Sequence, residues 1–335
     1  MSIHDALSAQ QFNDEFLTKV ASLEGQAQLS EAGRQYVKTE LQETAFSRAI
    51  IPQEPVTAAD CQRNVNDNSL YLIRDVEPGV SALGVDNLGE PDGNYIRGER
   101  YTIPIVNFVT KRFQITVEDL KAYQYKITKR IEDKSVPILE KLEDKLFLRM
   151  AGAAALATGG KSILTGGEFG TGTGNPGITT FDHVELKNKL QSGGAKKLEV
   201  ANMLMTQEMY ETIIEVPTAA DDFGTSRVID GISSDTAFGT KVIRTIKSDL
   251  IPTGHTFAFT KPDFLGHNFA LGEPTFEIKS QFGLIEWQTK ESVGMGLGNT
   301  EAVALAVNSN TADMADGTAV GTIAEAKAYY AALRV

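Results

Sequence analysis

The clearest pattern in the chain is a pair of segments with the character of β-strands, Ser69–Arg74 and Arg100–Val106. They flank a stretch rich in glycine, proline and acidic residues, which is typical of turns. The pattern predicts a long β-hairpin over Ser69–Phe108 with a hydrated tip. Because an isolated two-stranded hairpin is marginally stable in water, we expect this one to lie on another part of the protein or on a neighbour.

Helical spacing of apolar residues precedes the hairpin. One stripe runs from Leu7 to Val20, and a second runs from Tyr36 to Ala45, with Ser30 as its expected N-cap. Two prolines in Ile51–Pro55 then favour extended chain. The first part of the chain is therefore predicted to be a helical arm that packs on a larger body.

Two further helices are predicted after the hairpin. The first covers Val117–Ile131. The second is expected to start at Ser135, with Pro137 in its first turn, where a missing N–H costs little, and to continue to about Thr158. Its length suits a beam that connects parts of the molecule. The glycine-rich stretch Gly159–Gly177 is predicted to be a loop.

The remaining pattern mixes short strands and helices that do not alternate as βαβ units, which indicates the α+β class. The predicted helices are Thr180–Leu190, Gln207–Ile214 and Ile323–Leu333, and the predicted strands are Leu198–Met205, Lys241–Thr245, Thr256–Thr260, Phe269–Leu271, Thr275–Lys279, Leu284–Thr289 and Glu301–Val307.

The net charge and the cysteine count of the chain argue against some classes of function. The chain of 335 residues has a net charge of −12 and one cysteine, Cys61. This charge argues against a protein whose main task is to grip a polyanion, and the basic stretch Lys126–Lys134 is interpreted as a solvated helix face. The single cysteine excludes an internal disulfide framework, and no signal peptide or membrane-spanning run is expected.

Few residues or motifs are candidates for catalysis, nucleotide binding or metal binding. Gly172–Gly177 imitates a dinucleotide-binding fingerprint and Gly160–Ser162 the end of a phosphate-binding loop, but neither follows a predicted strand. No histidines have metal-ligand spacing, and His255 and His267 are expected in turns. Trp287 and its apolar neighbours, including Phe282, are interpreted as core or interface packing. We expect no enzyme activity, catalytic residue, cofactor or metal.

The order of helical arm, long hairpin, beam helix and α+β body resembles the major capsid proteins of tailed bacteriophages with the HK97 fold. The similarity covers about residues 30–308 by architecture, without a short diagnostic motif. The segments that carry it are Ser69–Phe108 (extended loop), Ser135–Thr158 (spine helix), Leu198–Pro217 (opening of the axial domain), Phe238–Ile243, Ala258–Phe264 and Gly283–Asn308 (strands returning to the peripheral domain).

This resemblance implies a division of the chain into the parts of that fold. They are an N-terminal arm (1–65), an extended hairpin loop (66–109), a peripheral domain with the spine helix (110–160 and 275–310), an axial domain (161–274) and a C-terminal tail (311–335).

The resemblance also implies a structural protein that self-assembles as pentamers and hexamers into an icosahedral shell around double-stranded DNA, without sequence-specific binding. Its implied partners are other copies of itself, a separate scaffolding protein, a portal and decoration proteins, with no membrane. The implied location is the virion, after assembly in the host cytoplasm. The acidic net charge suggests a wall that does not adhere to the packaged DNA.

One departure from that family concerns its covalent crosslink, which joins a lysine of the extended loop to an asparagine of a neighbour. No lysine occurs between Ser69 and Arg100, so no such bond is expected, and neither Asn299 nor Asn308 is assigned to it. Charged residues of the hairpin are instead our candidates for contacts between subunits: Asp75, Glu77, Asp86, Glu90, Asp92, Arg97 and Arg100.

Two alternatives stay open from the sequence. An encapsulin-like compartment shares the fold but encloses cargo enzymes. An enzyme with an unrecognised α+β site would form a discrete small oligomer.

Overall fold

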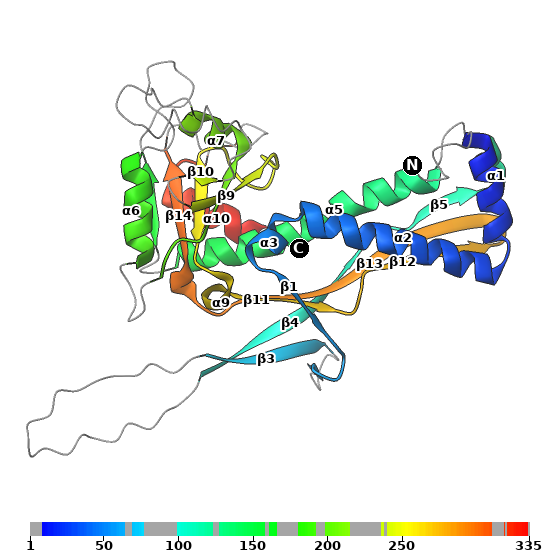
Figure 1. The fold of residues 1–335 in the computed structure, drawn as a ribbon, viewed down its shortest axis with the longest axis horizontal. Helices are drawn as coiled ribbons and strands as arrows, with labels where there is room; N and C mark the ends of the chain where they lie inside the picture. Colours follow the sequence, from blue (N-terminus) through cyan, green and yellow to red (C-terminus); the bar gives the residue numbers. More distant parts are fainter. Residues whose placement is uncertain are drawn as a thin grey trace, which may run out of the picture.

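A computed structural model describes residues 9–63, 69–76, 99–122, 127–157, 161–165, 180–191, 198–214, 236–237, 240–309, 318 and 320–333. The molecule is elongated, and a β-hairpin projects from its long side (Figure 1). Two β-sheets lie towards opposite ends, and one long helix connects them.

The first sheet is built around β13 (Leu284–Leu297). Within the described residues it contains eight strands, in the path β1-β11-β13-β4-β3-β2, with β12 and β5 also paired to β13. All pairs are antiparallel except β1 with β11. The other strands are β1 (Gln53–Val56), β2 (Gln62–Arg63), β3 (Leu70–Val76), β4 (Glu99–Val109), β5 (Phe113–Thr116), β11 (Gly266–Leu271) and β12 (Thr275–Gln281).

The second sheet has the order β6-β14-β10-β7-β9-β8. Its three middle strands are buried at every position, as expected for a sheet covered on both faces. Its strands are β6 (Ser162–Thr165), β7 (Asn202–Thr206), β8 (Thr236–Ala237), β9 (Thr240–Thr245), β10 (His255–Phe259) and β14 (Val303–Asn308).

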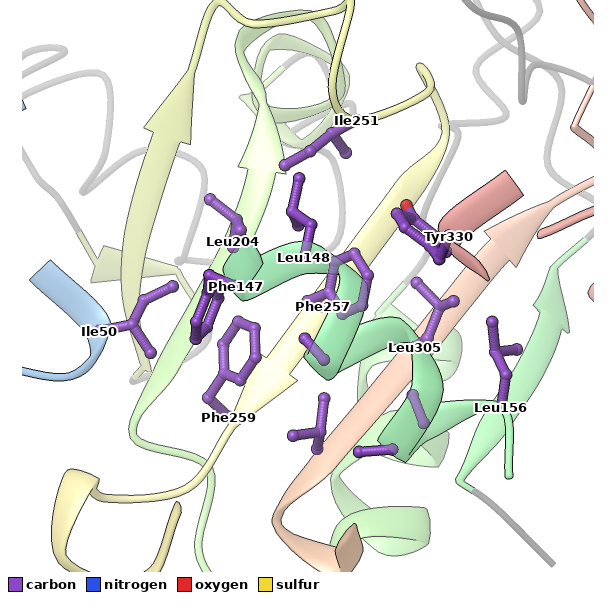
Figure 2. Packing of buried hydrophobic residues seen from close by; sticks show 14 of the residues in the cluster. Ile50, Phe147, Leu148, Leu156, Leu204, Ile251, Phe257, Phe259, Leu305 and Tyr330 are labelled. Carbon is purple, nitrogen blue, oxygen red and sulfur yellow. The ribbon is translucent and has the colours of Figure 1, made fainter. Parts of the chain in front are cut away.

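Alternate residues of the second sheet enter two cores. On one face, Phe257 and Leu305 pack against Phe147 and Leu148 of the long helix, and Tyr330 of α10 (Ile323–Ala332) closes the cluster (Figure 2). On the other face, methionine and alanine side chains pack against α6 (Thr180–Gln191) and α7 (Gln207–Ile214). The period of two along each strand therefore produces both layers.

The long helix, α5 (Ile127–Ala155), contributes to the cores of both sheets. Its Val136 and Leu139 pack in the core of the first sheet with Trp287, whereas Phe147 and Leu148 pack in the core of the second. With 29 residues it is roughly 43 Å long at ~1.5 Å per residue. It therefore has the connecting role that the sequence predicts for the beam helix.

The predicted start of this helix at Ser135 is wrong. The helix begins at Ile127 and contains Pro137 in its interior. The Ser135 hydroxyl donates to the carbonyl oxygen of Ile131 at 2.7 Å, one turn back, and so does not cap the helix. Pro137 lies on the exposed side, where water can satisfy the carbonyl that loses its N–H partner.

The N-terminal helices are α1 (Ala9–Val20), α2 (Leu23–Thr44) and α3 (Phe46–Ile50), and α4 (Val117–Ala122) precedes α5. The predicted cap at Ser30 is also wrong. Ser22 caps α2 by accepting from the N–H of Gly25, and Ser30 lies inside the helix. The Ser30 hydroxyl instead accepts from the N–H of Ile278, which attaches α2 to β12.

Two further expectations need correction. The stretch predicted as a loop, Gly159–Gly177, contains β6, which pairs in parallel with β14. His255 and His267 lie in strands β10 and β11 instead of turns.

Candidate assembly surfaces

The β3–β4 hairpin is attached to the first sheet at its base. Its strands pair from Tyr71 with Pro104 to Val76 with Glu99, which confirms the predicted arms. Leu72 and Ile103 pack with Phe269 of β11 in a small core of their own. The predicted tip, residues 77–98, lies outside the described residues. The base thus has its own anchor, independent of the tip.

Glycines on β13 allow the hairpin arm to lie very close. A Cβ atom on Gly296 would be 2.7 Å from Cγ1 of Ile103, and one on Gly294 would be 2.9 Å from Cδ1 of Ile105. Real Cβ atoms do not come this close to another carbon, so a larger residue at either position would force the side chain of Ile103 or Ile105 to move. Close backbone approach is a common reason for glycine within a strand.

Two of the predicted contact residues bind each other. The guanidinium Nε of Arg100 donates to Oδ1 of Asp75 at 2.7 Å across the hairpin, and both side chains are about 70% exposed. An exposed pair of this kind contributes little to stability. Both residues remain accessible to a neighbouring subunit. The other candidates, Glu77, Asp86, Glu90, Asp92 and Arg97, lie outside the described residues, so their role stays a prediction.

A buried group of charges joins the N-terminal arm to the body. Arg48 of α3 donates through Nε to Oε2 of Glu143 on α5 at 2.9 Å, and through Nη2 to Oε1 of Glu291 on β13 at 2.5 Å. The three side chains are at most 5% exposed. One arginine therefore connects three elements that are far apart in the sequence.

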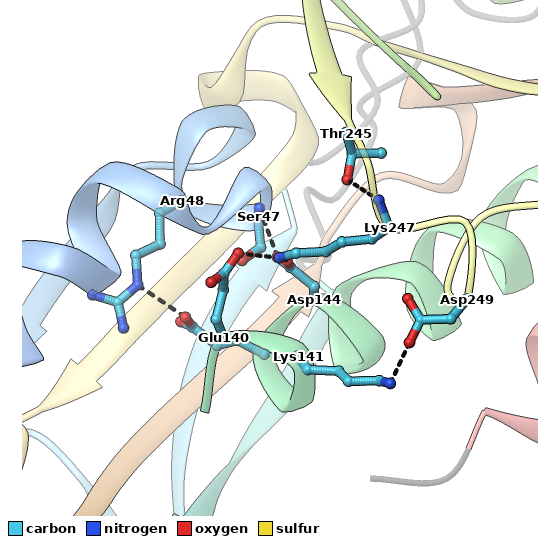
Figure 3. Close-up of polar contacts among 9 residues, drawn as sticks. Ser47, Arg48, Glu140, Lys141, Asp144, Thr245, Lys247 and Asp249 are labelled. Carbon is cyan, nitrogen blue, oxygen red and sulfur yellow. Dashed lines mark hydrogen bonds and ion pairs between the residues drawn. The ribbon is translucent and has the colours of Figure 1, made fainter. Parts of the chain in front are cut away.

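The same group extends to the second sheet through Lys247, which follows β9 (Figure 3). The Lys247 ammonium group donates to Oδ2 of Asp144 at 2.5 Å and to Glu140, both on α5. The backbone N–H of Ser47 donates to the other Asp144 oxygen at 3.1 Å. We call the six ionisable residues the charged joint: Arg48, Glu140, Glu143, Asp144, Lys247 and Glu291.

Charge is unbalanced in the charged joint, which holds four carboxyl groups and two cations. Burial raises the pKa of Glu143 to about 8 despite its bond to Arg48, and it raises the pKa of Asp144 to about 6 despite Lys247. Burial also opposes the charge on Arg48, but Glu143 and Glu291 outweigh it and raise the pKa of Arg48. We therefore expect Glu143 to hold a proton at neutral pH.

This imbalance predicts a dependence of stability on pH. A carboxyl group with a raised pKa contributes stability at low pH and loses that contribution as pH rises through its folded value. The free energy of unfolding should therefore fall between about pH 5 and pH 8.5. Glu143→Gln keeps an acceptor for Arg48 without the charge, so the variant should lose less stability over this range. Urea unfolding at several pH values measures the difference, and parallel curves for both proteins would contradict the assignment.

The turn between β12 and β13 contains Phe282, which the sequence analysis groups with Trp287 as core or interface packing. Trp287 and Ile285 are buried, as expected for core packing. Phe282, however, is fully exposed and has a φ of 50°, a left-handed conformation that disfavours a bulky side chain. The next residue, Gly283, has a φ of 77°, so the turn has positive φ at both central residues. An exposed aromatic residue in a strained turn is an additional candidate for a contact between subunits.

His255 attaches the C-terminal segment to the second sheet. Its ring is fully buried, with Nδ1 2.8 Å from the Tyr330 hydroxyl and Nε2 2.9 Å from the carbonyl oxygen of Val320. Because a carbonyl only accepts, Nε2 carries the proton and Nδ1 accepts from Tyr330. Burial lowers the pKa of His255 to about 4. The histidine therefore has a structural role.

The described part of the chain contains no group of three or more histidine, cysteine or acidic residues arranged to hold a metal ion. Within the same residues, no helix is long and apolar enough to span a bilayer. Lys161, part of the apparent phosphate-loop motif, is buried and donates to the carbonyl oxygen of Leu190 at 2.8 Å. Its ammonium group is therefore engaged in holding α6 beside β6. The apparent dinucleotide motif lies outside the described residues.

By sequence, the chain matches no protein-family model and no curated protein. By structure, it is similar to solved phage and capsid proteins. A chain from Microbacterium phage Oxtober96 has a TM-score of 0.53 at 9% identity, over 78% of this chain and 90% of that one. The capsid of a native GTA particle gives 0.52 at 14% identity, over 78% and 89%. The mature capsid of bacteriophage PhiM1 gives 0.55 at 9% identity, over 80% and 88%.

These similarities cover nearly the whole length of the compared chains. The protein therefore has the α+β HK97 fold of tailed-phage capsid proteins, which confirms the prediction from the sequence. At these identities the likeness defines the fold, and function has to be argued from the surfaces described above.

Proposed function

We propose that this chain is the major capsid protein of a tailed bacteriophage, which assembles as pentamers and hexamers into an icosahedral shell around double-stranded DNA. The observation that carries the proposal is the HK97 fold over about four-fifths of the chain, together with a projecting hairpin whose base is anchored on the body. The compared proteins from PhiM1 and the GTA particle are capsids.

Assembly stabilises such a chain through contacts that the monomer lacks. Extended elements offer surface to neighbours that a compact monomer cannot, and obligate contacts commonly bury more than roughly 2,000 Å². Each subunit contacts several neighbours at once, so modest pairwise energies add into a durable shell. The hairpin and the exposed Phe282 turn are the proposed contact regions.

The proposal includes the division into N-terminal arm, hairpin loop, peripheral domain, axial domain and tail. It also includes a structural, non-enzymatic role in the virion and assembly in the host cytoplasm, with a separate scaffolding protein, a portal and decoration proteins as partners. Contact through the hairpin is proposed to be non-covalent, because the hairpin lacks lysine between Ser69 and Arg100.

Electron microscopy of the purified protein, alone and after co-expression with a candidate scaffolding protein, tests this function. We expect closed particles of uniform diameter that contain DNA when isolated from infected cells. A discrete small oligomer under all conditions would overturn the proposal in favour of an enzyme or another binding protein. Closed particles filled with one cargo protein and no genome would support the encapsulin-like alternative.

A further inference from the structure

Charge is sorted by face along α5. Its acidic residues Glu140, Glu143 and Asp144 are buried and belong to the charged joint. Its basic residues point outward instead. Those with described side chains are exposed or half-buried: Lys129, Arg130, Lys134, Lys141, Lys145 and Arg149. The only acidic residue on α5 with a described, exposed side chain is Asp133.

Five of these basic residues share one side of the helix. Arg130, Lys134, Lys141, Lys145 and Arg149 are spaced by four or seven residues, which places them on one face of an α-helix. From Arg130 to Arg149 the row extends roughly 28 Å at ~1.5 Å per residue. We call this row the basic face of α5. It is present in a chain whose net charge is −12, so overall composition does not account for it.

Few acidic groups neutralise the basic face. Lys141 pairs with Asp249, and Asp133 accepts a hydrogen bond from the Tyr36 hydroxyl at 2.7 Å. Lys134, Lys145 and Arg149 have no carboxylate within ion-pair distance in the described part of the chain. These three cations are therefore available to an external anion.

The basic face is also held rigidly. The opposite side of α5 is buried in both hydrophobic cores and in the charged joint, so the helix cannot turn or fray without disrupting them. Exposed apolar surface within the row is limited to Ile138 and Pro137. A straight row of cations without an apolar groove suits a long, uniformly charged partner better than a folded acidic protein, which would need apolar anchors.

We propose that the basic face of α5 binds the phosphate backbone of duplex DNA and thus forms part of the inner surface of the shell. This inference rests on the proposed function and adds to it. Duplex DNA carries one negative charge per about 1.7 Å of its axis, so a row of this length meets many phosphates without defined register. Lysine binds phosphate as a point charge, so the contact should be independent of sequence and weakened by salt.

The proposal replaces the simpler expectation that an acidic chain repels the packaged DNA everywhere. With three free cations per subunit, each contact is weak, and the remaining acidic surface prevents tight adhesion. The wall would then hold DNA loosely while still allowing it to move.

Binding of the unassembled protein to a 30-base-pair duplex, followed by fluorescence anisotropy at several salt concentrations, tests the proposal. The test variant is K134Q/K145Q/R149Q. The matched control is K111Q/K121Q/K261Q, which removes the same charge from exposed lysines outside α5. Because each phosphate contact contributes about 0.9 to the slope of log K against log salt, the test variant should lose about 2 to 3 from this slope and bind at least about tenfold more weakly near 50 mM salt. The control should stay within about twofold of the wild type.

Equal loss in both variants, or no loss in the test variant, overturns the inference. Retained DNA binding together with lost binding of poly-glutamate would also overturn it, and would assign the face to an acidic protein. Urea unfolding midpoints within error of the wild type confirm that the variants fold. If the triple variant does not fold, K134Q/R149Q replaces it as the test variant. Particle formation by the test variant is scored separately, so failure of this inference and failure of the capsid assignment are distinguishable. A map of the shell with the basic face on its outer surface would contradict the inference independently.

Discussion

Replacing Arg48 by methionine is expected to lower the free energy of unfolding of the unassembled protein by about 3 to 5 kcal/mol at pH 8. The substitution leaves Glu143 and Glu291 buried without their cation, and two of their oxygens already lack a hydrogen-bond donor within the described structure. Removing one partner of a buried ion pair is costly because the remaining charge cannot return to water. Urea unfolding of wild type and variant measures the loss.

Arg34→Met is the matched control. Arg34 also forms two ion pairs, with Glu31 and Glu273 at 2.5 Å each, but these side chains are between 30% and 53% exposed. Removing exposed pairs costs only about 0 to 1 kcal/mol each. The difference between the two variants therefore isolates the effect of burial. Equal losses would show that the charged joint contributes no more than a surface pair.

Lower pH should reduce the penalty of Arg48→Met, because Glu143 can then hold a proton and needs no cation. Adding Glu143→Gln and Glu291→Gln to the variant should likewise recover part of the lost stability at pH 8, since the buried charges disappear with their partner. A penalty that is independent of pH and of these second substitutions would indicate lost packing of the arginine stem instead.

The local sequence pattern was sufficient to predict the elements in which apolar residues recur at a regular spacing. The hairpin arms, α7 and most strands of the second sheet occur where the sequence predicts them. The α+β class follows from the mixture of these elements, and their order carries the resemblance to the HK97 fold. The predicted strand Leu284–Thr289, in contrast, is too short, because β13 continues to Leu297 through Gly294 and Gly296. Glycine lowers strand propensity locally, and only the contact with Ile103 and Ile105 explains its presence.

The charged joint could not be predicted, because its members meet only in the folded chain. Arg48 is 95 positions from Glu143 and 243 from Glu291. The sequence alone does not show that Glu140, Glu143 and Asp144 are buried while the basic residues of α5 stay at the surface. Helix continuity through Pro137 was similarly hidden, because it depends on the proline lying on the side that faces water.

Deleting Val80–Tyr95 from the hairpin, with a two-residue Gly-Ser link in its place, is expected to abolish shells while the body stays folded. The base of the hairpin retains its strand pairing and its core of Leu72, Ile103 and Phe269, so the unfolding midpoint should change little. The deletion removes the part of the hairpin that is proposed to contact neighbouring subunits. Electron microscopy together with urea unfolding separates loss of assembly from loss of folding.

A charge swap in the same hairpin, Asp75→Arg with Arg100→Asp, is the control for the deletion. The swap preserves an ion pair across β3 and β4, so shells should still form if Asp75 and Arg100 interact mainly with each other. Loss of shells in the swapped variant would place these two residues in contact with a neighbour. Normal shells from the deletion variant would contradict the proposed role of the hairpin in assembly. The variant lacks the part of the hairpin to which contact between subunits is assigned.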